Sequence, residues 1–173
     1  MKLTCTSTLR DVVTEVGSVL SRGGVRAVLT GGACASIYSR GIYQSADVDF
    51  ILVSDTTRHR LDELPGTAGL RRSGDRYVHP ETRYYVEFPR GPLTIGSDDK
   101  IVPVELSVKG RSFLALSATD SCRDRLAATA SSYKNWSTSE LSGADAAQRG
   151  FDAQRLKFDG AAYSTHFRES AVL

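Results

Sequence analysis

The sequence predicts an α/β (α+β) domain in which helices flank a mixed β-sheet and a helical segment ends the chain. Helix-like and strand-like patterns alternate along residues 8–130. The 173 residues suit one core of ordinary size, and the fractions of apolar residues (40%) and charged residues (24%) are those of a globular protein. We expect a core over residues 1–116 and a C-terminal helical segment over residues 117–173 that packs on it.

The first helix is expected over residues 8–21. Ser7 or Thr8 can cap its start, and Gly23-Gly24 should end it. Its apolar residues recur at helical spacing: Leu9, Val12, Val13, Val16, Val19 and Leu20. This helix should therefore bury one face.

Two strands and a short helix are expected next. VRAVLT (25–30) has the composition of a buried strand, and Gly31-Gly32 predicts a turn. ACASIYSR (33–40) continues as a helix. VDFILV (48–53) is a second apolar strand.

A helix and a hairpin should follow the second strand. Ser54-Asp55 has the character of a helix cap, so we expect a helix over residues 55–64, broken by Pro65-Gly66. Residues 68–80 predict a polar hairpin with its turn at 73–75.

Two more strands are predicted at residues 84–88 and 101–108. The second alternates in hydrophobicity, and Pro103 within it indicates an edge strand or a bulge. No strand is predicted after residue 108.

A last helix is expected over residues 117–130, with Thr119 or Asp120 as its cap. The residues beyond it are rich in Ala, Ser and Gln and are weakly helical by composition.

Asp47 and Asp49 are the most informative pair in the chain. Side chains two apart on a strand share a face, about 6.5–7 Å apart, so these carboxylates should point one way while Val48 and Phe50 face the core. Two such carboxylates repel each other, and a bound divalent cation would offset the repulsion. Mg²⁺ takes one or two carboxylates and completes its shell with water and substrate phosphates.

A third acid would complete such a site. Glu87 is the candidate, since Val86 and Phe88 flank it as apolar residues flank the aspartates. Glu105 is the alternative, on the strand expected over 101–108.

Gly31 and Gly32 have a complementary property. They lie between a strand and a helix start, where backbone N–H groups and the helix dipole favour phosphate. Glycine also lets an anion approach the backbone closely, because it has no Cβ. A phosphate-binding loop followed by metal ligands predicts a nucleoside triphosphate site.

These residues resemble the DNA polymerase β-like nucleotidyltransferase superfamily. Its signature is an apolar residue with Gly-Gly or Gly-Ser, then Asp-apolar-Asp/Glu-apolar, then a later acid. Three stretches carry it here: Leu29-Thr30-Gly31-Gly32, Ser45-Ala46-Asp47-Val48-Asp49-Phe50 and Val86-Glu87-Phe88. Residues 85–96 and 117–128 are similar to small bacterial proteins of the abortive-infection and toxin–antitoxin type.

The resemblance implies the nucleotidyltransferase fold and transfer of a nucleoside monophosphate (NMP) group from a nucleoside triphosphate (NTP) to a hydroxyl. Asp47 and Asp49 would hold up to two Mg²⁺ ions, and Glu87 would bind one of them or act as base. The nucleotide-binding residues that the resemblance implies are Gly31, Gly32, Ser45 and Arg125, with Arg123 as the alternative to Arg125.

The resemblance also implies partners: an NTP, an RNA such as tRNA or a protein as acceptor, and a cognate antitoxin. A catalytically silent module of the same fold, which binds a nucleotide or a partner, is the rival hypothesis. The sequence has no long apolar run and no signal peptide, so we expect a cytoplasmic protein without a membrane span.

The remaining composition excludes other classes. The three cysteines, Cys5, Cys34 and Cys122, form no Cys-x-x-Cys motif, which argues against a zinc site. A net charge of +2 is too small to indicate nucleic acid by itself.

Overall fold

A computed structural model describes residues 2–137 of the chain, with side chains up to residue 130. Its elements are α1 (Leu9–Arg22), β1 (Ala27–Thr30), α2 (Gly31–Tyr38), β2 (Asp47–Leu52), α3 (Arg58–Thr67), β3 (Arg71–Ser73), β4 (Arg76–Val78), β5 (Tyr85–Glu87), β6 (Val104–Val108), β7 (Arg111–Ala115) and α4 (Ala118–Ser137). The predicted order of elements is confirmed, and β7 is added to it.

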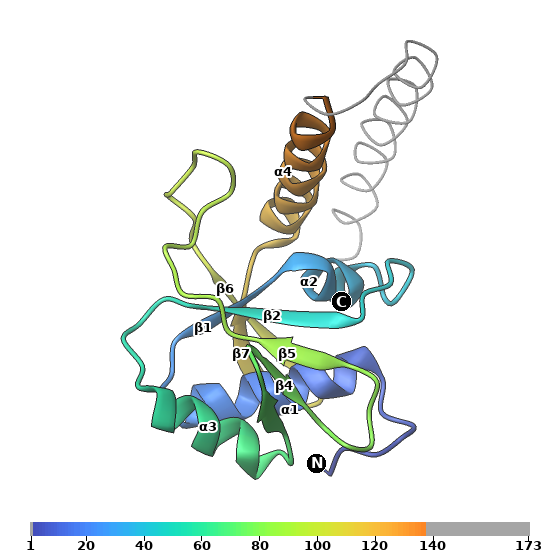
Figure 1. Cartoon of the computed structure of the whole chain (residues 1–173), viewed down its shortest axis with the longest axis vertical. Coiled ribbons are helices and arrows are strands. Elements are labelled where there is room, and N and C mark those ends of the chain that lie inside the picture. The colour runs from blue at the N-terminus through green and yellow to red at the C-terminus, as the bar shows by residue number, and fades with distance from the viewer. Residues whose placement is uncertain (1, 138–173) are drawn as a thin grey trace.

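The strands form one mixed sheet, as predicted, in the order β3-β4-β5-β2-β1-β7-β6 (Figure 1). Strand β2 runs antiparallel to β1 and parallel to β5, and β1 runs parallel to β7. The hairpin of β3 and β4 extends the sheet beyond β5.

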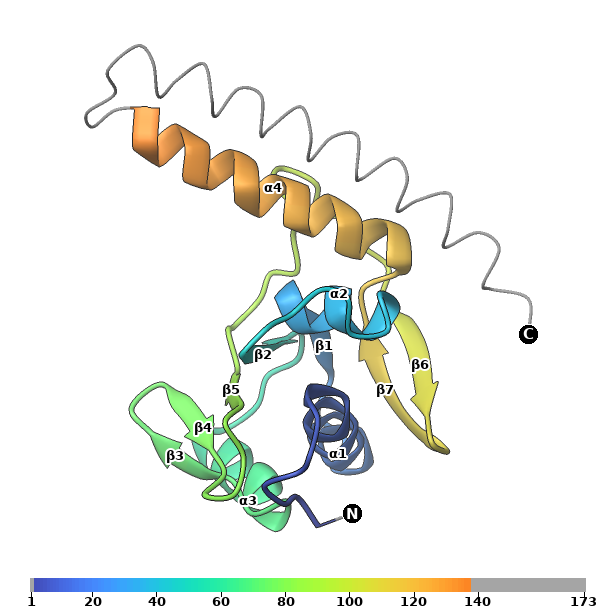
Figure 2. The same ribbon diagram turned by 90° about the vertical axis from the view of Figure 1, so that its right-hand side faces the viewer.

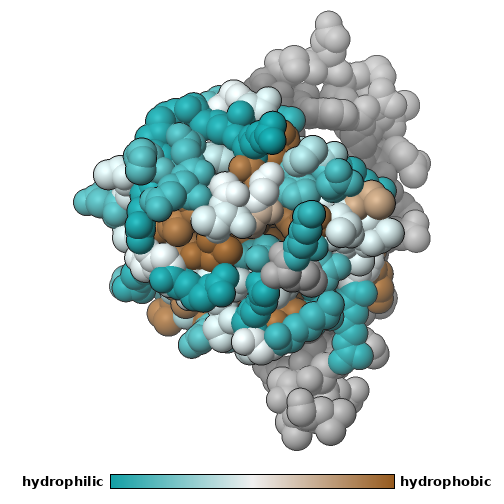
Figure 3. Space-filling model, turned by 90° about the horizontal axis from the view of Figure 1, so that it is seen from below, coloured by the Kyte–Doolittle hydropathy of each residue, from teal (hydrophilic) through white to brown (hydrophobic). Residues whose placement is uncertain are grey.

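Helices cover both faces of this sheet. Helices α1 and α3 lie on one side, and α2 lies on the other with α4 across it (Figures 1 and 2). The α1 side holds aromatic core residues: Phe50 stacks on Phe88 and meets Phe113 edge-on, each at 6.4 Å between ring centroids. Seen from below, apolar residues appear mostly in hollows between hydrophilic side chains (Figure 3).

Helix α1 begins as predicted. The Thr8 side chain accepts from the Asp11 N–H, and the Asp11 carboxylate accepts from the Thr8 N–H, which makes a capping box. The helix ends at Gly23, and Gly24 follows in the left-handed region with φ of +73°. This αL ending is the Schellman motif, because Gly24 and Val25 donate back to the carbonyls of Ser21 and Leu20.

The predicted limits of the third helix are wrong at both ends. It begins at Arg58 with Thr57 as the cap, because Ser54 instead accepts a hydrogen bond from the Arg26 N–H. Pro65 does not break it. Pro65 lies inside the helix, its carbonyl accepts from the Leu70 N–H, and Gly69 with φ of +84° supplies the ending.

Gly31-Gly32 is not a separate turn, which corrects the prediction. Both residues are the first residues of α2, whose N-cap is Thr30. A φ of +66° at Gly31 lets the chain pass from strand to helix without a loop.

Strand β7 was missed. Lys109 (φ of 52°) and Gly110 (φ of 73°) both adopt left-handed backbone and form a two-residue hairpin turn between β6 and β7. Leu106 and Phe113 face each other across this hairpin, and β7 continues the sheet to β1.

Strand β6 starts at Val104, three residues later than predicted. Pro103 stands just before it, and β6 is the outermost strand, as the proline indicated.

Helix α4 is capped by Ser117, whose hydroxyl accepts from the Asp120 N–H at 3.0 Å, rather than by Thr119 or Asp120. Residues 118–137 of the predicted C-terminal segment are helical, and the rest of that segment lies outside the described residues. No helix within residues 2–137 is long and apolar enough to cross a lipid bilayer.

Candidate active site

Strand β2 presents the two aspartates as the sequence predicts. Its side chains alternate along the strand: Val48, Phe50 and Leu52 are buried, whereas Asp47 and Asp49 are half-buried on the opposite face. The buried side packs toward α1, so the aspartates point to the side of the sheet that α2 covers. Both carboxylates therefore occupy one face next to the start of α2.

The neighbouring strands bring two further residues beside Asp49. Thr30, the cap of α2, is its register partner on β1, and Glu87 is its register partner on β5. Asp47 in turn lies opposite Tyr85. The acid predicted from the later strand thus lies next to the aspartates along the sheet.

Glu105 does not reach this site. It is exposed on β6, and β1 and β7 separate β6 from β2. Three strand spacings amount to about 14 Å. Of the two predicted candidates for the third acid, Glu87 is the one that lies near Asp49.

The two glycines at the start of α2 are packed against the acidic strand. A Cβ at Gly31 would lie 2.6 Å from Asp49 Oδ2, and a Cβ at Gly32 would lie 2.5 Å from Ser45 Oγ. Both distances are shorter than real Cβ contacts. The absence of side chains here is what lets the helix start approach the carboxylates.

Ser45 is bound to the first aspartate. Its hydroxyl donates to Asp47 Oδ1 at 2.5 Å. This hydrogen bond orients one carboxylate and leaves its second oxygen for another ligand. Ser45 lies beside Gly32 as well, so it joins the two parts of the site.

Asp49 has a perturbed acidity. Burial raises its pKa to about 6, and the negative charges of Asp47 and Glu87 add to the increase, while Arg125 partly opposes it. Mutual repulsion among the three carboxylates is therefore a property of the folded protein. Groups with such environments gather at functional sites.

Glu87 is held by an arginine from the hairpin. Arg76 Nε lies 3.0 Å from Glu87 Oε1, and the Arg76 guanidinium stacks over the Tyr85 ring at 4.3 Å. Among the described residues, no group of three His, Cys, Asp or Glu side chains is arranged to hold a metal ion. In this arrangement the pair Asp47 and Asp49 is suited to a cation, and Glu87 is engaged elsewhere.

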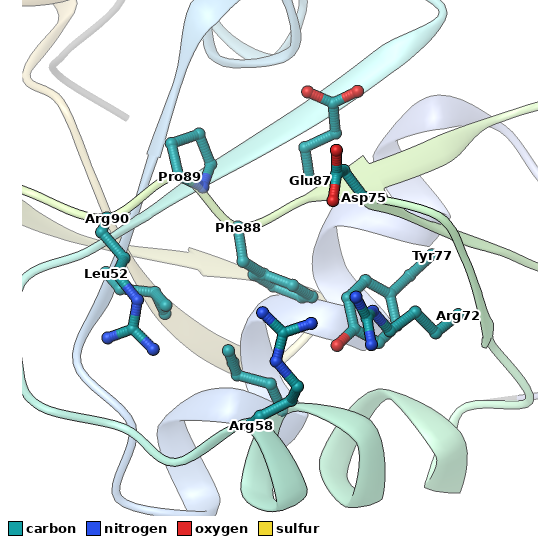
Figure 4. Close-up of a pocket in the computed structure, with 10 residues that line it drawn as sticks. Leu52, Arg58, Arg72, Asp75, Tyr77, Glu87, Phe88, Pro89 and Arg90 are labelled. Atoms are coloured by element: carbon teal, nitrogen blue, oxygen red, sulfur yellow. The ribbon is translucent and has the colours of Figure 1, made fainter.

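The far side of β5 forms a different cavity, of about 370 Å³. Phe88 and Leu52 lie in it with three arginines, Arg58, Arg72 and Arg90, whereas the Glu87 carboxylate points away from Phe88 (Figure 4). The two aspartates do not line this cavity.

Arg125, rather than Arg123, faces the aspartates. Its charge acts on Asp49, it donates to Asp124 Oδ2 at 2.6 Å, and it forms a side-chain hydrogen bond with Tyr43. Arg123 instead pairs with Asp98 and Asp120.

Sequence reasoning missed two residues of the site, Tyr43 and Arg76. The Tyr43 ring lies against the first turn of α2, 3.2 Å from where a Cβ at Gly32 would be. Arg76 reaches Glu87 through the pairing of β4 with β5. The exposed run Ile42-Tyr43 so close to the aspartates was a usable signal for the tyrosine, whereas Arg76 gave none.

Comparisons with known proteins identify the fold. No family model and no curated protein matches the chain. An antigenic nucleotidyltransferase-like protein from Paracoccidioides brasiliensis is similar in structure, with a TM-score of 0.53 and 18% identity over 71% of this chain and 66% of that one. ANT(2″)-Ia in complex with adenylyl-2″-tobramycin is also similar, with a TM-score of 0.52 and 11% identity over 96% of this chain and 100% of that one.

At these identities the likeness concerns the fold. The chain therefore has the nucleotidyltransferase fold, which confirms the predicted fold class. The chain spans just under two thirds of the fungal protein.

Proposed function

We propose that this protein transfers an NMP group from an NTP to a hydroxyl acceptor, with Mg²⁺ held by Asp47 and Asp49. One observation carries the proposal: two carboxylates on one face of β2 lie against a helix start from which side chains are excluded. Cation ligands and phosphate donors are thereby adjacent, which is the arrangement that an NTP bound with Mg²⁺ requires.

The aspartates fit a divalent cation. Burial is the main cause of the raised pKa of Asp49, the negative charges of Asp47 and Glu87 add to it, and a bound cation would favour the ionised carboxylate against both. Bound Mg²⁺ would supply charge neutralisation for the phosphates and polarisation of the reacting phosphoryl group. Once it leaves Arg76, Glu87 would be available beside Asp47 and Asp49, either as a third ligand or as the base of the reaction.

The phosphates would bind at the start of α2. The first N–H groups of a helix have no partner within the helix and can donate to an anion. Gly31 and Gly32 let this helix start lie close to Asp49 and Ser45, so a phosphate bound there would adjoin the cation ligands, and Arg125 supplies a positive charge beside Asp49.

The transfer itself is a displacement at the α-phosphorus. The acceptor oxygen forms a bond to this phosphorus, the bond to the bridging oxygen breaks, and pyrophosphate leaves. The proton of the acceptor hydroxyl passes to a carboxylate, for which Glu87 is our assignment. RNA or protein supplies the hydroxyl in this proposal.

A silent binding module is the second candidate. The ion pair between Arg76 and Glu87 favours it, because a cationic side chain already occupies the third carboxylate. Such a module would bind an NTP without transferring it.

One experiment separates the two. The purified chain is incubated with Mg²⁺, each of the four α-labelled NTPs, and total RNA, total protein or tobramycin as acceptor. We expect one acceptor class to be labelled by the wild type, no label with Asp49→Asn, and full label with the control Asp75→Asn, whose exposed side chain lies in the hairpin turn. Absence of label in every arm, together with a rise in melting temperature on adding Mg-NTP, would establish the silent module instead.

The toxin role is a finer part of the proposal. Expression of the wild type should arrest bacterial growth, and Asp49→Asn should not. Growth that is equal for the two chains would remove the toxin assignment and leave the transfer reaction to the labelling experiment.

A further inference from the structure

A second cavity, of about 370 Å³, adjoins the candidate active site at Ser45. It lies where the start of α1, the end of α2 and the segment before β5 meet. Arg10, Arg40, Ser45, Arg83 and Tyr84 are among its lining residues. Ser45 connects the two sites, because its hydroxyl binds Asp47.

The charge in this cavity has one sign. Arg10, Arg40 and Arg83 line it, and no Asp or Glu among the described residues does. None of the three forms an ion pair with a described residue; Arg83 stacks on the Tyr84 ring at 5.1 Å and donates to its hydroxyl. Three guanidinium groups from separate segments therefore produce a positive potential, and the Asp47 carboxylate, bound to Ser45 at the edge of the cavity, offsets only part of it.

The acidic residue that follows Arg10 in the sequence, Asp11, is already paired. Asp11 binds the Thr8 hydroxyl, and its carboxylate also accepts from Lys109 Nζ at 3.1 Å. The contact with Lys109 reduces the influence of Asp11 on the three arginines.

Arg40 occupies the left-handed position at the end of α2, which is usually taken by glycine. Arg40 and Gly41 donate back to the carbonyls of Ile37 and Ser36, which is the Schellman motif that also ends α1 and α3. In those helices a glycine takes the left-handed position, whereas in α2 Arg40 takes it with φ of 53°. Non-glycine residues with such backbone are uncommon and gather at functional sites.

We propose that this cavity binds a backbone phosphate of RNA and so identifies RNA as the acceptor class. The inference rests on the proposed function, since it assigns the acceptor of the same site. Guanidinium groups bind phosphate through several N–H donors at once. Arginines on separate segments beside the half-buried Tyr84 ring suit a chain in which phosphates and bases alternate, as in single-stranded RNA.

Binding is measured without NTP or Mg²⁺, so that transfer plays no part. A labelled single-stranded RNA of twelve nucleotides is titrated with the full chain and followed by fluorescence anisotropy. The variants are the double change Arg10→Gln with Arg83→Gln, and Arg40→Asn, because asparagine tolerates left-handed backbone. The control is Arg71→Gln, an exposed arginine of β3 that does not line this cavity.

We expect about tenfold weaker binding for the double variant and a binding constant within about twofold of wild type for the control. The slope of log K against log salt should fall by about 0.7, because one phosphate contact is lost. Circular dichroism melts verify that all variants are folded. Equal RNA binding by wild type, the double variant and Arg40→Asn would overturn the proposal.

Competition distinguishes the ligand sources. Inorganic phosphate at high concentration should displace the RNA, because it has the recognised group, whereas a phosphoserine peptide at the RNA's concentration should not. Complete displacement by the peptide would overturn RNA as the acceptor class. If the arginines bind RNA but the wild type transfers no NMP, the proposed function fails and the cavity assignment stands. If the variants bind RNA like wild type while protein is labelled, the cavity assignment fails and the proposed function stands.

Discussion

Arg76 Nε lies 3.0 Å from Glu87 Oε1, so a guanidinium neutralises the third carboxylate of the candidate site. The same guanidinium stacks on Tyr85, the register partner of Asp47. A side chain of β4 thus controls how much negative charge faces a cation at the aspartates.

Replacing Arg76 should strengthen metal binding. In Arg76→Gln the Glu87 carboxylate is released and a competing positive charge is lost, so the Kd for Mn²⁺ should fall about threefold to tenfold. Isothermal titration without NTP measures it, with Arg71→Gln as a control for the loss of one arginine. Weaker Mn²⁺ binding by Arg76→Gln would mean that Arg76 positions Glu87 for the metal rather than withholding it.

Asp49→Asn should stabilise the protein at neutral pH. Because the pKa of Asp49 is raised from 3.8 to about 6 on folding, ionising this group costs stability as pH rises through that interval, and the cost is complete above it. The shift sets an upper limit of about 3 kcal/mol, which solvent screening of a half-buried group reduces to about 1 kcal/mol. Urea unfolding of both chains at pH 7.5 and pH 4 tests this: the difference should nearly vanish at pH 4.

Gly31→Ala should destabilise the fold by about 2–5 kcal/mol, since left-handed backbone costs about 1–2 kcal/mol and overpacking about 1–3 kcal/mol. The new Cβ would lie 2.6 Å from Asp49 Oδ2 at a φ of +66°. Gly74→Ala is the matched control, because Gly74 has a φ of +63° and open space around it. Urea unfolding should show a clearly larger loss for Gly31→Ala; equal losses would remove the steric contribution of Asp49.

Arg125→Gln should raise the KM for the NTP by about tenfold or more, because a charge-assisted hydrogen bond contributes about 1.5–3 kcal/mol. Arg123→Gln is the comparison, since Arg123 lies on the same helix but pairs with Asp98 and Asp120. Steady-state kinetics with the labelled acceptor measures both. An equal effect of the two changes would indicate that the whole helix, not one charge, supports binding.

The local patterns of the sequence predicted much of the fold and the site. The alternation from Asp47 to Leu52 predicted which side chains are buried, because a strand has a strict period of two. Thr8 was predicted as one of two caps from its position before an apolar helix. Glu87 was predicted as third acid from its apolar neighbours, and the register places it beside Asp49.

The misses depend on information that no local pattern holds. Strand β7 was missed because the turn before it begins with Lys109. Lysine is unusual in a left-handed hairpin turn, so the sequence did not indicate a turn there. The helix limit at Pro65 was misjudged because the ending is set by Gly69, four residues later. Arg76 reaches Glu87 only through pairing between β4 and β5, which the sequence does not specify.

The strand order has a consequence for motion. With three strands on each side, β2 is the middle of the seven, so its amides should exchange with deuterium as slowly as global unfolding allows. Strands β3 and β4, three residues each, end the sheet, and the buried Tyr77 ring holds β4 to the core at 5.0 Å from the Phe88 ring. The aspartates are thus anchored in the most protected backbone, while Arg76 lies two strands closer to the edge of the sheet, where amide exchange should be faster.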